Sequence, residues 1–454
     1  MINTNYFMKS EQQYIDLYTQ ASQLIKSKSV KVMNDLRDEA FMNFKKLGFP
    51  SKKEERYKYT NIHSLFEPNY GLNLNRLEIP IDPYKTFKCG IPNLSTSLYF
   101  IVNDQLYTKK LPNTYLGEGV IIDSLAKAAT HYPELITKYY GKLAKTSEDG
   151  ITALNTMLAQ DGLFIYVPKN VKLKNTVQIV NILRSDVDLM VNRRVLIILE
   201  EGAEGQFLFC DDTADDRNFL TTQVIEAFVG NNAHIDLNCL EETHTKNVRI
   251  SNAFIQQESY SKASHNVITL HNGITRNMLN LTFKGQHSEC FINGCIIADK
   301  EQHVDNNTLI DHAAPHCQSH ELYKYVLNDK AVGAFAGLVL VRKEAQKTTS
   351  IETNRNLVST NTARMYSQPM LEIYADDVQC NHGSTVGQLN DAALFYMQQR
   401  GIDQQEARTL LQTAFIYEVI DKIELDSLRE RLHLLVEKRF RGELNKCNRC
   451  KICK

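Results

Sequence analysis

A cysteine and a histidine lie two positions apart in the segment DDVQCNHGSTVGQLND, residues 376–391. Cys380 and His382 could be a pair of metal ligands, a nucleophile with its base, or a buried thiol beside a hydrogen-bonded imidazole. On a β-strand, side chains two positions apart point the same way and can reach one ion. Thiolate and imidazole suit iron, zinc or copper, but two ligands are too few for a closed site. We therefore expect the remaining ligands from another chain or a bound cluster.

The direction of these two side chains depends on the strand that precedes them. In MLEIYADDVQCNH, the apolar residues Leu371 and Ile373 alternate with polar ones. If this strand continues without a bulge, Cys380 and His382 fall on the side opposite to the apolar residues. A kink at residues 376–377 would reverse the assignment. An uninterrupted strand thus predicts that the pair faces away from the core.

A second segment, EQHVDNNTLIDHAAPHCQSHELYK, is rich in imidazoles and contains His303, His312, His316, His320 and Cys317. On a helix the last three histidines would share one face and could hold a metal ion. Pro315 and the β-like flanks argue against a continuous helix. Structural turns and interface contacts are therefore the alternative interpretation of this segment, and the one we favour.

The end of the sequence, KCNRCKICK, has the spacing C-x2-C-x2-C, formed by Cys447, Cys450 and Cys453. This spacing matches the start of an iron–sulfur ligand run but lacks the fourth cysteine and the proline that follows it. The three thiolates could bind a soft metal, or the segment could be a disordered tail.

Common catalytic motifs do not occur in the sequence. It contains no G-x-x-x-x-G-K-[ST] phosphate-binding loop and no G-x-S-x-G nucleophile motif. We therefore expect no nucleotide site in this chain and no self-contained nucleophilic active site.

Composition narrows the class of protein. The chain has 454 residues, of which 43% are hydrophobic and 23% charged, so it is long enough for several domains or one elongated fold. A net charge of −1 argues against bulk attraction to nucleic acid or an anionic membrane. No signal-peptide pattern or membrane-spanning apolar run is present, and the ten cysteines are widely spread. These features favour a soluble intracellular protein with reduced thiols.

The remaining pattern predicts the elements that carry these residues. Apolar residues at helical spacing indicate helices around residues 14–25 and 33–47 and again after residue 390. From about residue 150, short β-rich runs bounded by Gly, Asn or Asp recur about every 8 to 12 residues. So many short strands favour a parallel β-helix or solenoid over a sandwich or barrel. Terminal helices on such a scaffold could dock a partner or simply cap its end.

Several motifs resemble one family. QPMLEIYADDVQCNHGSTVGQLNDAALFYMQQRGI (368–402), HVDNNTLIDHAAPHCQSHELYK (303–324), AQKTTSIETNRNLVST (345–360), ALNTMLAQDGLFIYVPKNV (153–171) and, more weakly, GFPSKKEERYKYTNI (48–62) look like the SufB/SufD family of iron–sulfur cluster assembly proteins. The CNHGSTVGQLN form is closest to the SufD branch. Arg56-Tyr57 departs from the usual pattern, in which a tryptophan is common, and the triple-cysteine tail has no counterpart in it.

The resemblance implies a mainly β fold, a right-handed parallel β-helix flanked by helical domains. We expect an N-terminal helical domain at 1–90, the β-helix at 91–388, a C-terminal helical domain at 389–446, and a cysteine-rich tail at 447–454. It also implies pairing with a SufB-like subunit through the β-helix and docking of a SufC-like ATPase on the C-terminal helices. A homodimer is possible for the isolated chain.

The function implied is that of a cytoplasmic, non-catalytic scaffold of the SUF system that holds a transient iron–sulfur cluster shared with its partner. His382 matches the histidine that the family uses at the subunit interface, and Cys380 matches the neighbouring thiol. One alternative is an adaptor whose cysteine and histidine are structural. A β-helix carbohydrate-active enzyme is a further alternative, but such an enzyme requires a carboxylate cluster in a groove and usually carries an export signal.

Overall fold

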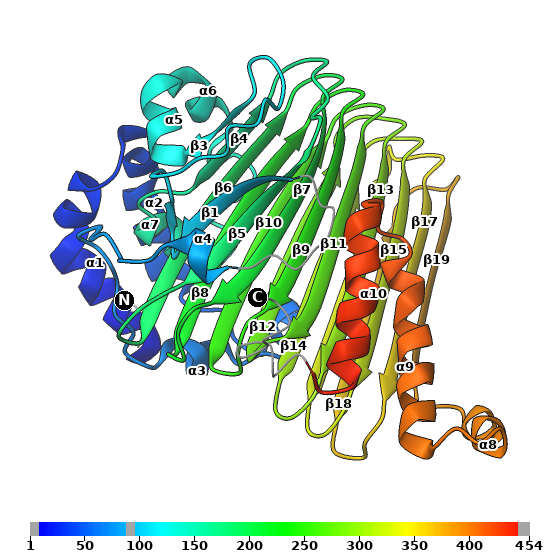
Figure 1. Ribbon diagram of the computed structural model, residues 1–454. Helices are drawn as coiled ribbons and strands as arrows, with labels where there is room; N and C mark the ends of the chain where they lie inside the picture. Colours follow the sequence, from blue (N-terminus) through cyan, green and yellow to red (C-terminus); the bar gives the residue numbers. More distant parts are fainter. Residues whose placement is uncertain (1–8, 88–95, 444–454) are drawn as a thin grey trace, which may run out of the picture.

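The computed structural model describes residues 9–87 and 96–443 (Figure 1). Its centre is a solenoid of about eight turns with two sheets. From residue 163 onward the strands are parallel and alternate between the sheets, whereas two short strands before that point pair antiparallel. The predicted mainly β fold, a β-helix with helices at both ends, is confirmed. The predicted domain boundary at 90/91 and the cysteines of the 447–454 tail lie outside the described residues.

One sheet, called here the first sheet, ends at β19. In spatial order its strands within the described residues are β2 (Gln105–Leu106), β1 (Thr96–Val102), β5 (Thr176–Leu183), β7 (Glu204–Thr213), β9 (His234–Glu242), β11 (Lys262–His271), β13 (Glu289–Ala298), β15 (Gln318–Leu327), β17 (Thr349–Val358) and β19 (Gln379–Gly387).

The second sheet ends at β18. Its described strands are, in order, β3 (Ile121–Ser124), β4 (Leu163–Val167), β6 (Leu189–Leu199), β8 (Phe219–Val229), β10 (Asn247–Gln257), β12 (Ile274–Phe283), β14 (His303–His312), β16 (Val332–Val341) and β18 (Arg364–Ile373).

Helices gather at the two ends of the chain and in one insertion before the regular turns. They are α1 (Lys9–Ser27), α2 (Lys31–Leu47), α3 (Ile62–Phe66), α4 (Pro83–Thr86), α5 (Leu125–His131), α6 (Pro133–Tyr139), α7 (Gly150–Leu158), α8 (Asp391–Gln399), α9 (Gln404–Ile420) and α10 (Asp426–Phe440), with a short 3-10 turn at Glu55–Tyr57. Among the helices at 9–87 and 96–443, none is long and apolar enough to cross a membrane.

One corner of the solenoid repeats a left-handed backbone conformation from turn to turn. Asn232, Tyr260, His287 and His316 all have φ between 55° and 60°. The backbone N–H of each such residue donates to the next turn, for example from Tyr260 to the carbonyl of Gln286 at 2.9 Å. This conformation is unfavourable in free energy for bulky residues, and ring stacking offsets part of that cost. The ring centroids of Tyr260 and His287 lie 5.0 Å apart, and those of His287 and His316 lie 4.6 Å apart.

The space between the two sheets, called here the lumen, is the main core. Strands of both sheets fill it with side chains such as Ile197, Phe207, Ile255, Ile292 and Tyr325. Because side chains alternate along a strand, every second residue of each strand points into the lumen and the others point outward. Lumenal residues that are register partners on successive strands of one sheet form a column along the solenoid, and the strand register alone identifies its members.

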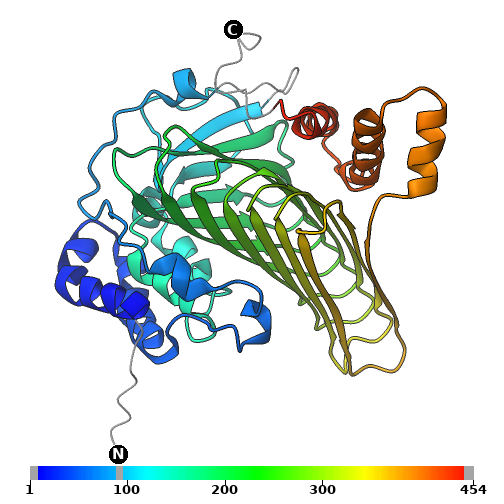
Figure 2. The same cartoon turned by 90° about the horizontal axis from the view of Figure 1, so that it is seen from below.

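The outer faces of the sheets are covered by different helices. At the N-terminal end, α1, α2 and α7 pack on the second sheet around Met190, Leu220 and Ile250. On the first sheet, α9 and α10 cover a second apolar layer (Figures 1 and 2). The buried Lys324 of β15 fastens α9, since it donates to the carbonyl of Phe415 at 2.8 Å and pairs with Glu418.

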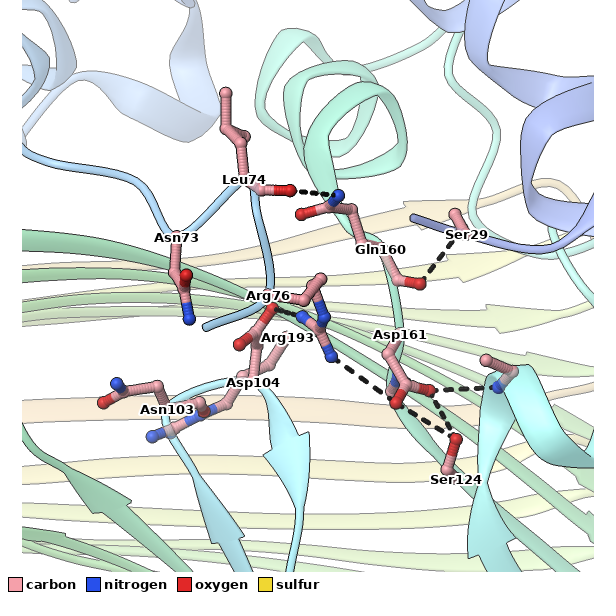
Figure 3. A network of polar contacts seen from close by, with 12 residues as sticks. Ser29, Asn73, Leu74, Arg76, Asn103, Asp104, Ser124, Gln160, Asp161 and Arg193 are labelled. Atoms are coloured by element: carbon pink, nitrogen blue, oxygen red, sulfur yellow. Dashed lines mark hydrogen bonds and ion pairs between the residues drawn. The ribbon is translucent and has the colours of Figure 1, made fainter. Parts of the chain in front are cut away.

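A polar network closes the solenoid at its N-terminal end (Figure 3). Arg76 pairs with Asp104 and, at 3.5 Å, with Asp161. Asp161 also accepts from the hydroxyl of Ser124 at 2.8 Å, and Arg193 reaches the carbonyl of Asn103 from inside the lumen at 2.7 Å. These contacts tie the N-terminal loops to the first turns, so this end is covered by protein.

Candidate functional site

The opposite end of the solenoid is open. In the described part of the chain, β18 and β19 each pair with only one neighbour in their sheets, β16 and β17 respectively. The chain then leaves for α8, which projects to the side and does not cover this end (Figure 2). Each of the two terminal strands therefore presents an unpaired backbone edge, the usual place for another strand to add.

Cys380 and His382 lie on β19 and face the lumen. In the strand register, His382 lies next to Glu352 of β17, and Glu352 lies next to Glu321 of β15. Glu321 lies next to Ile292 of β13, whose side chain is lumenal, so all of these side chains face the lumen. The prediction that the pair faces away from the core, which assumed an uninterrupted strand, is wrong. β18 ends at Ile373, and the chain turns a corner before β19 begins. The alternative of a kink at residues 376–377 is the one that occurs.

The two side chains differ in their surroundings. Cys380 is half-buried and packs beside Val339, Val341 and Ala375, so burial raises the pKa of its thiol. A hydrogen bond with the backbone of Ser350 partly offsets that rise. The imidazole of His382 is exposed at the rim. The pair thus combines a sheltered thiol with an accessible imidazole nitrogen.

Two glutamates lie directly below His382 in the lumen. Glu352 is 1% exposed and Glu321 is 3% exposed; among the described residues Glu321 has the hydroxyl of Thr308 as a hydrogen-bonding neighbour, whereas neither oxygen of Glu352 has a hydrogen-bond partner. Burial raises the pKa of both groups, and the nearby Glu321 raises that of Glu352 further. We did not predict this pair from the sequence. The sequence could have indicated it, because Glu321, Tyr323 and Tyr325 occupy alternate positions of one strand. Glu321 therefore points to the same apolar side as the two tyrosines.

A chain of hydroxyls runs along the lumen to Cys380. The imidazole of His312 lies 2.9 Å from the hydroxyl of Ser319, which donates to the hydroxyl of Ser350 at 2.8 Å. Ser350 is the register partner of Cys380. Burial lowers the pKa of His312 to about 3, so its imidazole is neutral. The inner wall beside Cys380 is therefore polar without being charged.

The histidines of the segment 301–324 do not come together in one site. His303 faces the outer side of the second sheet beside Thr60, whereas His312 lies in the lumen. His316 sits at the corner stacked on His287, and His320 stacks on Phe291 outside the first sheet. Cys317 is buried in the lumen. The metal interpretation of this segment is wrong because it contains the corner of a turn, which sends its side chains in four directions.

No group of three His, Cys, Asp or Glu side chains within residues 9–87 and 96–443 surrounds a common point at metal-binding distance. That Cys380 and His382 bind a metal stays a prediction, and the described residues add no third ligand to them in this arrangement. Apolar side chains are exposed around the pair: Ile373 is 40% and Val386 54% exposed, although both occupy lumenal positions. In the inner turns such positions are covered by the next pair of strands.

Comparison with known families places the chain in one of them. Residues 8–179 match the family description "SufBD protein N-terminal region", and residues 182–415 match "SUF system FeS cluster assembly, SufBD core domain". The chain therefore belongs to the SufBD family of the SUF system for iron–sulfur cluster assembly.

Relatives within this family carry more particular names. The iron–sulfur cluster assembly protein SufD of Escherichia coli is 26% identical over 399 residues, which cover 87% of this chain and 90% of the relative. SufD of Bacillus subtilis is 25% identical over 400 residues, covering 86% and 91%. A SufBD family protein of Synechocystis is 27% identical over 407 residues, covering 86% and 87%. The resemblance to SufB/SufD proteins is confirmed, and the chain is a homologue of SufD proteins.

Proposed function

We propose that this chain is a non-catalytic scaffold subunit of a cytoplasmic SUF complex, where it helps to build and pass on a nascent iron–sulfur cluster. The cluster is cargo, shared with a SufB-like subunit that continues the solenoid at its open end. A SufC-like ATPase, docked on the C-terminal helices, supplies the nucleotide chemistry. The observation that carries the proposal is the half-site of Cys380 and His382 on the lumenal face of a terminal strand.

The open end supports a partner of similar architecture. The edges of β18 and β19 present unpaired backbone groups, and Ile373 and Val386 present apolar side chains that an inner turn would cover. A second solenoid added here would cover both and would bring its own side chains to Cys380 and His382. In the isolated chain, a second copy could occupy the same surface.

The two residues have separate roles in this proposal. His382 is exposed, so its imidazole can ligate or position iron at the interface without a rearrangement of the core. The thiol of Cys380 is sheltered and assists in iron or sulfur handling beside it.

Anaerobic co-expression with SufB-like and SufC-like proteins tests the proposal. We expect a stable complex that contains all three chains and, after supply of iron and a sulfur donor, both iron and acid-labile sulfide. The measurement is co-purification followed by iron and sulfide analysis. A stable complex that never holds iron or sulfide, with or without Cys380 and His382, would instead identify a structural adaptor.

Replacing Phe395 by alanine is expected to weaken binding of the ATPase subunit. Phe395 is 62% exposed on α8, which projects from the solenoid, and a large exposed aromatic side chain is a typical anchor for a partner. Retention of the ATPase by the immobilised chain measures the effect.

The matched control is Met42→Ala, which removes a side chain that is 61% exposed on α2 at the other end of the molecule. Equal retention of the ATPase by Phe395→Ala and Met42→Ala would show that α8 is not its docking element.

A further inference from the structure

The residue directly inward from His382 is a glutamate of the same chain. Glu352 on β17 and His382 on β19 are register partners and both face the lumen. Neighbouring strands are about 4.8 Å apart, so two long side chains on one face of adjacent strands can meet at one point. The candidate site therefore has a possible third member that does not depend on a partner subunit.

The carboxyl of Glu352 is unusual among buried carboxyls of this chain. Glu226 is also fully buried, but it accepts hydrogen bonds from three backbone N–H groups and pairs with Arg194 at 2.8 Å. Neither oxygen of Glu352 has a protein partner within the described ranges. Buried polar groups are almost always paired, because an unpaired one loses its hydration without compensation. The head group of Glu352 is thus free to bind a ligand.

The opposite wall leaves room for this carboxyl. Gly337 on β16 faces Glu352 across the lumen, and a Cβ atom built on Gly337 would lie 2.2 Å from Oε1 of Glu352. Any other residue at position 337 would displace the carboxyl. Its backbone is not in the left-handed region, so the close approach of Glu352, and not the backbone conformation, accounts for the glycine.

We propose that Glu352 is a further ligand for a divalent cation held by His382, so that the site extends one turn into the lumen. This inference rests on the proposed function and adds a ligand from this chain to that site. The imidazole has to turn inward, and no hydrogen bond or ion pair holds it among the residues that the structure describes. Carboxylate and imidazole together suit Fe2+ and its spectroscopic substitute Co2+.

Titration of the full-length chain with Co2+ under anaerobic conditions tests the assignment. Isothermal calorimetry gives the affinity, and the visible absorbance of bound Co2+ reports its ligands. We expect Glu352→Gln to weaken binding by at least about ten-fold, the scale of losing a residue that supports a metal site. We expect His382→Ala to do the same, and the double variant to lose little more than either, because both residues act on one ion.

Two control variants separate ligation from general charge. Glu321→Gln removes a carboxyl of the same lumenal column one strand further from His382, and Glu372→Gln removes an exposed one on β18. Glu372→Gln is expected to bind Co2+ within about two-fold of the unmodified chain. Glu321→Gln is expected to bind it no more weakly, because Glu321 raises the pKa of Glu352 and its removal favours the ionised carboxyl. Equal losses for Glu321→Gln and Glu352→Gln would overturn the assignment. Glu352→Asp, which keeps a carboxyl but withdraws it toward its own strand, replaces Glu352→Gln if that variant does not fold.

The Co2+ titration distinguishes a failure of the Glu352 assignment from a failure of the proposed function. If His382→Ala abolishes Co2+ binding and Glu352→Gln does not, Glu352 is not a ligand and the role of His382 stands. If the unmodified chain binds Co2+ no better than His382→Ala, the assignment is overturned, while cluster formation on the complex still decides the proposed function.

Discussion

Replacing His382 by alanine is expected to abolish iron–sulfur cluster formation on the complex while the chain still folds. The imidazole is exposed on the last strand, so its removal leaves no cavity and costs little stability. What is lost is the imidazole that we propose binds iron, and Cys380 is the one other proposed ligand on the same strand. Iron and sulfide content and visible absorbance after anaerobic reconstitution measure the result, and circular dichroism checks the fold.

Asn381→Ala is the matched control for this experiment. Asn381 is the residue directly before His382 on β19, is also exposed, and points to the opposite face of the strand. Its replacement is expected to leave the cluster yield unchanged. A normal cluster yield from His382→Ala would remove His382 from the site.

Replacing Glu226 by alanine is expected to destabilise the protein by about 3–5 kcal/mol, the cost of leaving a buried charge without its partner. Both Glu226 and Arg194 are fully buried, and Glu226 also accepts from the backbone of Gly141, Leu143 and Ala144. The substitution leaves the charge of Arg194 without a carboxylate and the three N–H groups without an acceptor, although the guanidinium keeps its hydrogen bond to the hydroxyl of Thr156 at 3.1 Å. The chain has no tryptophan, so urea unfolding is followed by far-ultraviolet circular dichroism.

Glu201→Ala provides the comparison for this loss. Glu201 pairs with Lys169 at 2.7 Å, but both side chains are about half exposed, and such pairs contribute about 1 kcal/mol or less. Its urea midpoint is expected to stay close to that of the unmodified protein. If Glu226→Ala lowered the urea midpoint no more than Glu201→Ala does, the buried ion pair would contribute no more to the free energy of unfolding than the exposed one.

Local features of the fold were predictable from the sequence because their causes lie within a few residues. Asn390 caps α8 by accepting from the N–H of Ala393, and Asp403 caps α9 in the same way. Gly48 ends α2 with a φ of 66°. The repeated short strands also predicted a solenoid, because that pattern is itself local.

The site was harder to predict because its geometry depends on register between strands far apart in sequence. Glu321, Glu352 and His382 come together only because successive turns place them in one column. A corner after Ile373 reversed the side to which Cys380 and His382 point. Neither fact can be derived from the alternation within a single strand.

The packing of α9 has a mechanical consequence. Lys324 on β15 and Arg355 on β17 both pair with Glu418 of this helix, so a force applied to α9 acts on both strands. The opposite faces of the same strands carry Glu321 and Glu352. A pull on α9, such as the proposed ATPase subunit would exert, would thus act through the wall of the solenoid on the strands next to β19 and His382.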